Sequence, residues 1–200
     1  MIKRQISSKL KIDATEQFDF EIAYEYIDRD TLLDAVVLVN RKEYAFKKSS
    51  QSENKSFFEK MGYTGPYNYV YVYLGTNKEL IDTHPVGSNV HFPLSVNFES
   101  ISNPSQKDFY VEYRINNSKY RNYYTLKNNK LHLIFNCPVF DKIGDKTPIA
   151  YHIEHKESSV RIGKDIVLYH AELKGYDPKK IEDVNAYTPA EIIPTDEIFV

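Results

Sequence analysis

Histidine is the residue in this sequence best suited to acid–base or metal chemistry, and the densest group is the run Tyr151-His152-Ile153-Glu154-His155. Side chains alternate along a strand, so His152 and Glu154 would share one face while His155 points to the other. Two imidazoles arranged in this way cannot bind one ion unless the strand ends between them. We therefore expect polar surface residues here, with no metal and no cofactor; if a metal were bound, His152, Glu154 and His155 would be its ligands.

Asp82 and His84 lie two positions apart, and such a pair can hold an imidazole in one tautomer, as catalytic dyads do. The sequence ties no nucleophile to them, so a hydrogen-bonded pair without a catalytic role is the favoured interpretation. The single cysteine, Cys137, follows an apolar strand and precedes a proline, which is typical of a core residue and not of a reactive thiol. Phosphate-binding loops, nucleophile elbows, CxxC pairs and HExxH are all absent from the sequence. These features favour a protein that is not an enzyme.

Tyrosines at alternate positions mark residues 66–75 as a strand without a solvent face. Tyr67, Tyr69, Tyr71 and Tyr73 fall on one face, and valine and leucine side chains fall on the other. Such a strand is expected at the centre of a fold, covered on both sides. The four rings are either packing residues, which we favour, or a recognition surface. The lack of tryptophan argues against a sugar platform, and the lack of interleaved basic residues argues against a platform for bases.

Two further places are candidate binding surfaces. Arg121 and Tyr123 are two positions apart, so on a strand they would share a face that could accept an anionic or planar ligand. The chain closes with Ile198, Phe199 and Val200, in a segment whose prolines prevent a helix. An apolar extended tail has the form of a peptide that adds to a sheet edge. We expect it to close an edge of its own domain; docking on a partner or on a second copy of the chain is the alternative.

Strand-like patterns recur along the whole chain, at residues 17–27, 33–40, 43–48, 66–75, 79–83, 90–98, 109–115, 120–126, 130–136 and 149–153. Residues 165–173 fit a strand or a short helix, and their alternation favours the strand. Residues 33–48 are expected to form a hairpin, and residues 50–61 a short helix. Pro93 is expected to place the strand 90–98 at an edge, and Cys137-Pro138 to end a meander of three strands. No internal repeat is visible.

These elements predict a mainly β protein, an antiparallel β-sandwich or jelly-roll-like fold with one or two short helices. The residues expected in its core are Val70, Val72, Phe92, Leu94, Val96, Val111, Tyr113, Leu133 and Ile153. The 200 residues form either a single all-β domain over 1–200 or two subdomains divided near 100–107, where turn-forming residues replace the alternation.

Charge and composition narrow the partners. The net charge of -2 supplies no basic field for nucleic acid, although the first twelve residues are locally basic and are expected to form a solvated arm or a first strand. No apolar run is long enough to cross a membrane, so no membrane partner is expected. A single cysteine suits a reducing compartment, which favours a cytoplasmic location.

The favoured function is therefore a non-enzymatic structural or accessory protein that works through contacts with a protein partner or with a second copy of itself. The alternative is a small-ligand or carbohydrate-binding jelly-roll, with catalysis left open, in which Tyr, His and carboxylate side chains line a cavity between sheets. Convergence of His152 and Glu154 with His84 or His91 would favour the alternative, and their dispersal would favour the first.

Overall fold

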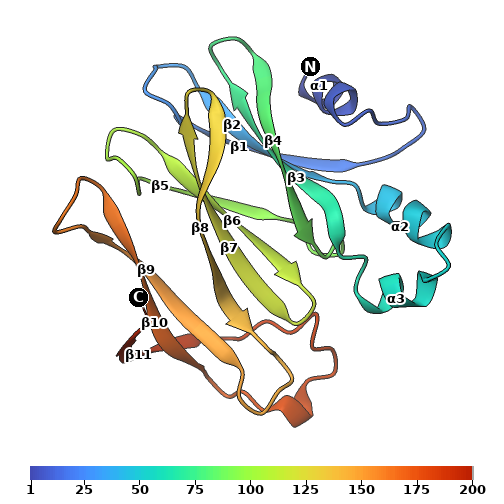
Figure 1. Cartoon of the computed structure of the whole chain (residues 1–200), viewed down its shortest axis with the longest axis vertical. Coiled ribbons are helices and arrows are strands. Elements are labelled where there is room, and N and C mark those ends of the chain that lie inside the picture. The colour runs from blue at the N-terminus through green and yellow to red at the C-terminus, as the bar shows by residue number, and fades with distance from the viewer. Residues whose placement is uncertain (200) are drawn as a thin grey trace.

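Two antiparallel sheets make up most of the structure, a computed structural model that describes residues 1–199 (Figure 1). Strands account for 48% of the residues and helices for 13%, so the expected mainly β, sandwich-like fold is confirmed. The candidate tail residue Val200 lies outside the described residues. Within those residues, no helix combines the length and the apolar character needed to cross a membrane.

The four-stranded sheet has the order β1-β2-β3-β4 and consists of β1 (Asp19–Glu25), β2 (Asp34–Asn40), β3 (Gly65–Leu74) and β4 (Glu79–Ser88). The seven-stranded sheet has the order β11-β10-β9-β8-β7-β6-β5. Its strands are β5 (Ser95–Glu99), β6 (Asp108–Ile115), β7 (Ser118–Lys127), β8 (Lys130–Asp141), β9 (Ile149–Glu157), β10 (Lys164–Leu173) and β11 (Ile192–Ile198). The helices are α1 (Ile2–Lys9), α2 (Lys42–Ser50), α3 (Lys55–Lys60) and the 3-10 turn η1 (Pro178–Lys180).

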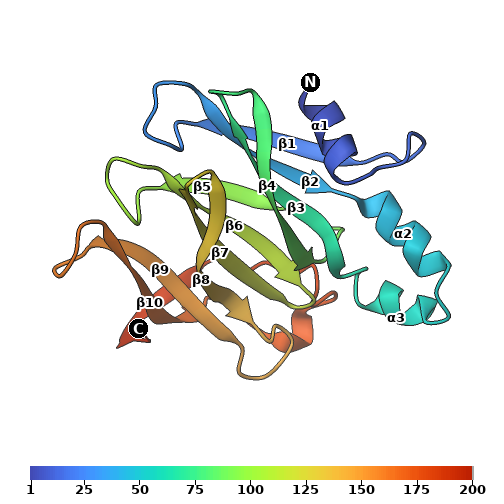
Figure 2. The same ribbon diagram turned by 45° about the horizontal axis from the view of Figure 1, so that its top comes forward.

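The seven-stranded sheet bends sharply between β8 and β9, which pair through only two residue pairs, so the strands lie in three layers (Figure 2). One core cluster fills the space between the four-stranded sheet and β5–β8; it includes Val36, Val70, Val111 and Phe109. A second cluster lies between β5–β8 and the β9–β10 hairpin; it includes Tyr123, Cys137, Tyr151 and Leu168. The central part of β5–β8 is therefore covered on both faces.

The strands β1–β4 and β5–β8 are two four-stranded meanders that begin with the same loop. Three residues of the first loop, Glu25, Ile27 and Asp34, recur 74 positions later as Glu99, Ile101 and Asp108. In each loop the buried aspartate accepts hydrogen bonds from the backbone N–H of the isoleucine and of the residue after it. In each loop the glutamate accepts from the residue that follows it. This internal repeat of structure was not visible in the sequence, because few positions besides these are shared.

The basic N-terminal segment is a helix and not a solvated arm. Ile2 and Ile6 lie on one face of α1 and pack over the outer face of the four-stranded sheet, where Ile6 is fully buried. Gln5 holds the helix in place, because its amide donates to Lys78 O at 2.9 Å and accepts from Leu80 N at 2.6 Å. The four-residue spacing of the isoleucines was the signal for this helix.

Three local predictions were wrong for identifiable reasons. Residues 43–48 belong to α2 instead of a strand, because Ala45 and Ser49, four positions apart, are the buried residues of that segment. The strand predicted over 90–98 begins only at Ser95, the first residue of β5. The meander does not stop at Pro138: β8 continues to Asp141, since the proline faces an edge where no strand needs its missing N–H.

Candidate functional site

Strand β8 has a long exposed edge in the middle of the seven-stranded sheet. On one side it pairs with β7 along its whole length, but on the other side β9 pairs only with Phe140 and Asp141. Within the part of the chain that the structure describes, residues 132–139 have no strand partner on that side. Figure 1 shows the upper part of β8 curving away from β9. This edge therefore presents backbone N–H and C=O groups that a further strand could pair with.

Three consecutive apolar side chains stand at this edge. Leu133, Ile134 and Phe135 are exposed to 49%, 42% and 37% of their area. The register with β7 shifts between Tyr123 and Tyr124, where the opposite residues change from Phe135 to Leu133, so Ile134 is an extra bulged residue. A bulge bends its strand, which explains both the departure from β9 and the exposure of neighbouring side chains. Leu133, predicted to be core, is thus a surface residue.

Asp82 and His84 do not form a catalytic dyad; both bind the backbone of Leu131 at the start of this edge. An Asp82 carboxylate oxygen accepts from Leu131 N at 2.8 Å, and His84 Nε2 lies 2.9 Å from Leu131 O. Asp82 reaches this position from a bulge in β4, where its φ is 40°. The two side chains therefore form the hydrogen bonds with Leu131 that a neighbouring strand would otherwise form. Within the described chain, residues 132–139 of β8, which follow Leu131, have no strand partner on this side.

Replacing Asp82 with alanine should lower the free energy of unfolding by about 1–3 kcal/mol, because the buried N–H of Leu131 loses its acceptor. Asp82→Asn keeps an acceptor oxygen and tolerates the positive φ, so its loss should be less than half as large. Urea unfolding of the three proteins measures both values. Equal stability of Asp82→Ala and the native protein would show that the hydrogen bond from Leu131 N to Asp82 does not stabilise the fold.

A buried polar network lies directly behind Phe135, whose ring centroid is 6.2 Å from that of Tyr123. Arg121 and Tyr123 share a face as predicted, and Arg121 Nη1 donates to the Tyr123 hydroxyl at 3.0 Å. The Tyr123 hydroxyl in turn lies 2.9 Å from His155 Nε2. Because Arg121 already donates to this oxygen, the tyrosine proton is left for Nε2, which places the imidazole proton on Nδ1, 3.6 Å from Glu99 Oε2. The network thus connects β7 to β9 and β5.

Both ends of the network are ion pairs. Glu112 on β6 binds Arg121 Nη2 at 2.8 Å and Lys119 Nζ at 2.6 Å. Glu99 binds Lys164 Nζ on β10 at 2.8 Å. The Arg121 guanidinium also lies 3.9 Å from the centroid of the Tyr110 ring. Each charged group of this face therefore has a partner of opposite sign, although Arg121 and Lys119 share one carboxylate, and the network supports the β8 edge.

Burial sets the protonation states around this network. Burial would raise the pKa of Glu112, but the hydrogen bonds and charges of Lys119 and Arg121 outweigh it and lower the pKa. Burial lowers the pKa of His155 more than Glu99 raises it, so the imidazole is neutral at pH 7. Burial also raises the pKa of the Cys137 thiol to about 11, and the side chain is 2% exposed. Cys137 is therefore an unreactive core residue, as its sequence context indicated.

Acid should weaken the protein through these groups. The pKa of His155 is lower in the folded state than the ordinary value of 6.5, so the stability that the neutral imidazole contributes is present above that value and is lost as the pH falls. Glu99 has a lowered pKa because Lys164 binds it, and its contribution is likewise lost below the ordinary value of 4.5. Urea unfolding from about pH 7 to about pH 4 measures this decline. His155→Gln should flatten the part of the decline that begins near pH 6.5 and leave the part that begins near pH 4.5; an unchanged profile in this variant would contradict the assignment.

The tyrosine stripe is covered by the chain itself. Tyr71 is fully buried beneath α1, and Tyr69 and Tyr73 pack against the same cluster. Tyr67 is half-buried and lies against Tyr44 of α2, with ring centroids 6.0 Å apart. Val70, Val72 and Leu74 fill the core on the other face. The strand is therefore central, as predicted, and the helices occupy the face on which a recognition surface would have been.

The C-terminal tail closes an edge of its own sheet. Strand β11 pairs with β10, and Phe199 N donates to Leu168 O at 2.8 Å. The Phe199 ring lies 5.0 Å from that of Tyr151 and 5.5 Å from that of His170, measured between centroids. Ile198 and Phe199 nevertheless remain 58% and 52% exposed.

The histidines are dispersed. His152 Nε2 lies 3.4 Å from Glu154 Oε1 on an outer face, whereas His155 faces the internal network, as strand alternation indicated. His84 binds Leu131, and His91 lies beside Phe46 and Tyr63. Over residues 1–199, no group of three or more His, Cys, Asp or Glu side chains is placed to hold a metal ion.

Sequence reasoning missed the β8 edge, although one signal was present: Leu-Ile-Phe at 133–135 breaks the alternation of a strand with a wet face. Comparisons of the chain with protein-family models, with curated proteins and with solved structures each find no match. The class of protein that the fold defines is a layered antiparallel β-sandwich, and its function has to be inferred from the site alone.

Proposed function

We propose that this protein is a non-enzymatic binding protein that takes up an extended segment of another protein along the edge of β8. The observation that carries the proposal is the coincidence of an unpaired strand edge with three exposed apolar residues, Leu133, Ile134 and Phe135. Backbone hydrogen bonds to an added strand supply affinity, and alternate side chains of that strand supply specificity. The paired network behind Phe135 keeps the edge rigid, which limits the entropy lost on binding.

The outer edges of the two sheets carry features that discourage added strands. Strand β4 has a bulge at Asp82 followed by Pro85, and β1 alternates its apolar residues with Asp19 and Glu21. Strand β5 has five residues, and β11 contains Pro194. Bulges, prolines, charges and short length are the devices by which proteins protect strand edges. The β8 edge has a bulge at Ile134 and a proline farther along at Pro138, but residues 133–135 carry no charge and no proline, so this part is the least protected of these edges.

The dispersal of the histidines supports the same proposal over a catalytic jelly-roll. His84, His91 and His152 each contact different partners, so no acid–base constellation forms from them. A partner in the form of a second copy of this chain is included in the proposal, because the exposed edge of one molecule could pair with the same edge of another.

Placing a charge on the edge should abolish binding without unfolding the protein. In Ile134→Lys, the charged lysine would lie where the added strand must pack, so binding should be lost. The fold should be kept, because the isoleucine side chain that is replaced is already 42% exposed. Affinity purification from the native host with the native protein and with Ile134→Lys should recover partners, or a second copy, with the native protein only. Val160→Lys, at an 86% exposed apolar residue of the β9–β10 hairpin, is the matched control and should bind as the native protein does.

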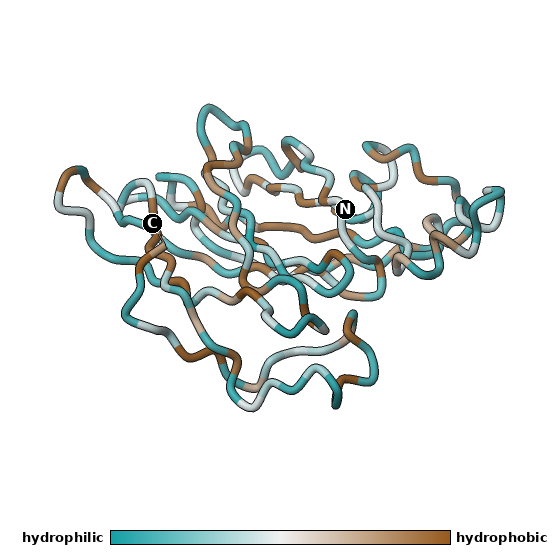
Figure 3. Tube along the Cα trace, turned by 60° about the horizontal axis from the view of Figure 1, so that its bottom comes forward, coloured by the Kyte–Doolittle hydropathy of each residue, from teal (hydrophilic) through white to brown (hydrophobic). Residues whose placement is uncertain are grey.

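Figure 3 shows why this control is needed, since hydrophobic residues colour the tip of the β9–β10 hairpin as well as the strands. If binding is lost with Val160→Lys and kept with Ile134→Lys, the hairpin tip is the binding surface and the proposal is wrong. Retention of every partner by Ile134→Lys also contradicts it.

A further inference from the structure

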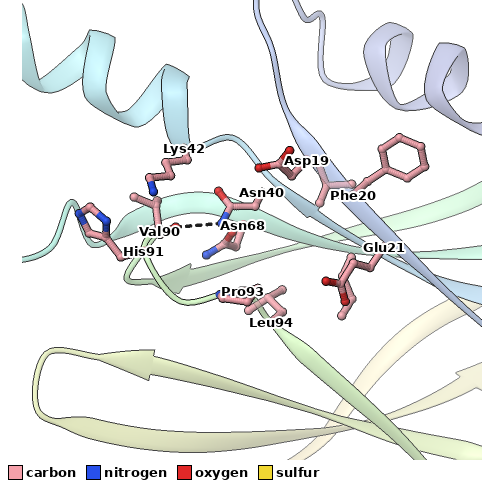
Figure 4. Close-up of a pocket in the computed structure, with 12 residues that line it drawn as sticks. Asp19, Phe20, Glu21, Asn40, Lys42, Asn68, Val90, His91, Pro93 and Leu94 are labelled. Carbon is pink, nitrogen blue, oxygen red and sulfur yellow. Dashed lines mark hydrogen bonds between the residues drawn. The ribbon is translucent and has the colours of Figure 1, made fainter. Parts of the chain in front are cut away.

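A pocket of about 420 Å³ lies at the open end of the sandwich, and none of its lining residues belongs to β8 (Figure 4). One wall is the inner face of β1–β3, where Asp19, Asn40 and Asn68 stand in one row across the three paired strands. The other wall is the segment that joins β4 to β5, with Val90 and Leu94 among its lining residues. The volume is that of a site for a small molecule.

The charged groups of the pocket stand on opposite sides. Asp19 and Glu21 project from β1 on one side, and Lys42, the first residue of α2, lies on the other side near His91, with the asparagines between them (Figure 4). Among the ion pairs of the described chain, none involves Asp19, Glu21 or Lys42. The pocket is thus negative on one side and positive on the other.

Two buried amide oxygens at the centre of the pocket wall lack a hydrogen-bond partner among residues 1–199. Asn40 Nδ2 donates to Val90 O at 2.9 Å, which fixes the amide orientation and leaves Oδ1 as the unpaired acceptor. Asn68 is fully buried; its Nδ2 donates to Ser88 Oγ at 2.7 Å, and its Oδ1 is also unpaired. Unpaired buried acceptors are costly. Because both oxygens are buried, a donor from a ligand reaches them only when the asparagine side chains turn toward the pocket.

We propose that this pocket binds a small zwitterion of the size of an amino acid or a dipeptide. Its ammonium group meets Asp19 and Glu21 and directs donors toward the two asparagines, and its carboxylate meets Lys42. Charge-assisted hydrogen bonds at both ends select for this pairing of groups. A neutral sugar fits less well, because it would leave both charged sides of the pocket without a partner of opposite charge. This site is independent of the β8 edge.

The test is a titration of isotope-labelled protein, followed by nuclear magnetic resonance, with glycylglycine and with each of the twenty amino acids at about 10 mM. We expect at least one probe to shift the side-chain amide signals of Asn40 and Asn68. For that probe, the N-acetylated form and the C-terminal amide should each bind about tenfold more weakly, since each removes one charge. Asp19→Asn, Glu21→Gln and Lys42→Gln should have effects of the same size.

The matched control is Glu53→Gln, which removes one negative charge from an exposed loop residue outside the pocket and should bind the probe unchanged. Ile134→Lys should also bind it unchanged, so failure at one site is separable from failure at the other. The proposal is overturned if no probe shifts these amide signals, or if the charge-blocked forms bind as tightly as the zwitterion.

Discussion

Glu112→Gln is expected to lower the free energy of unfolding by about 3 kcal/mol, because Arg121 and Lys119 then lose the carboxylate that both of them bind. The Glu112 and Arg121 side chains are each only 13% exposed, and Lys119 shares the same carboxylate. Removing one member of a buried ion pair costs more than the pair contributes, since the remaining charge stays desolvated. Urea unfolding at neutral pH measures the loss.

The control for this variant is Glu154→Gln, the same substitution in a surface pair. Glu154 binds Lys156 at 3.0 Å, but both side chains are well exposed, at 39% and 51%. Its loss should be much smaller than that of Glu112→Gln, because water screens this pair. Losses of similar size in the two variants would mean that the internal network does not stabilise the layers.

Phe109→Ala is expected to cost about 3–5 kcal/mol, because it empties the centre of the core between the two sheets. Phe109 is fully buried, and its ring stacks on that of Tyr124 with centroids 5.4 Å apart. Phe57→Ala, at a residue of α3 that is 59% exposed, is the matched truncation and should change stability by less than about 0.5 kcal/mol. A thermal midpoint unchanged by Phe109→Ala would contradict the assignment of this core.

Strand alternation was sufficient to predict the central strand and the meander. Val70, Val72, Leu94 and Val111 are buried as predicted, and the two-residue turn at Asn128 and Asn129 has positive φ at both positions, which asparagine tolerates. Residues 100–107 form the loop between β5 and β6, and Ile101 and Asp108 near its ends are buried. Strand alternation gave a wrong prediction where a helix covers a sheet, as at residues 43–48. The mixture of polar and apolar residues in that helix resembles the pattern of a strand with one face in water.

The candidate site was harder to predict because it depends on bulges. Arg121 and Tyr123 share a face by simple alternation, but their burial results from β9 and β10, which are more than twenty-five residues away in the chain. The exposure of Leu133 results from one extra residue in β8, and a single-residue bulge has no reliable signature in a sequence. The roles of Asp82 and His84 likewise follow from a long-range contact with Leu131.

The most direct test of the β8 edge as a binding surface is site-specific photo-crosslinking in the native host. A photoreactive phenylalanine analogue replaces Phe135 in one version of the protein and Val160 in the other; both sites are exposed. We predict a discrete covalent adduct with another protein, or with a second copy of this chain, from position 135, and its loss when Ile134→Lys is added. No adduct from position 135, or an adduct that persists with the charged edge, would contradict the account.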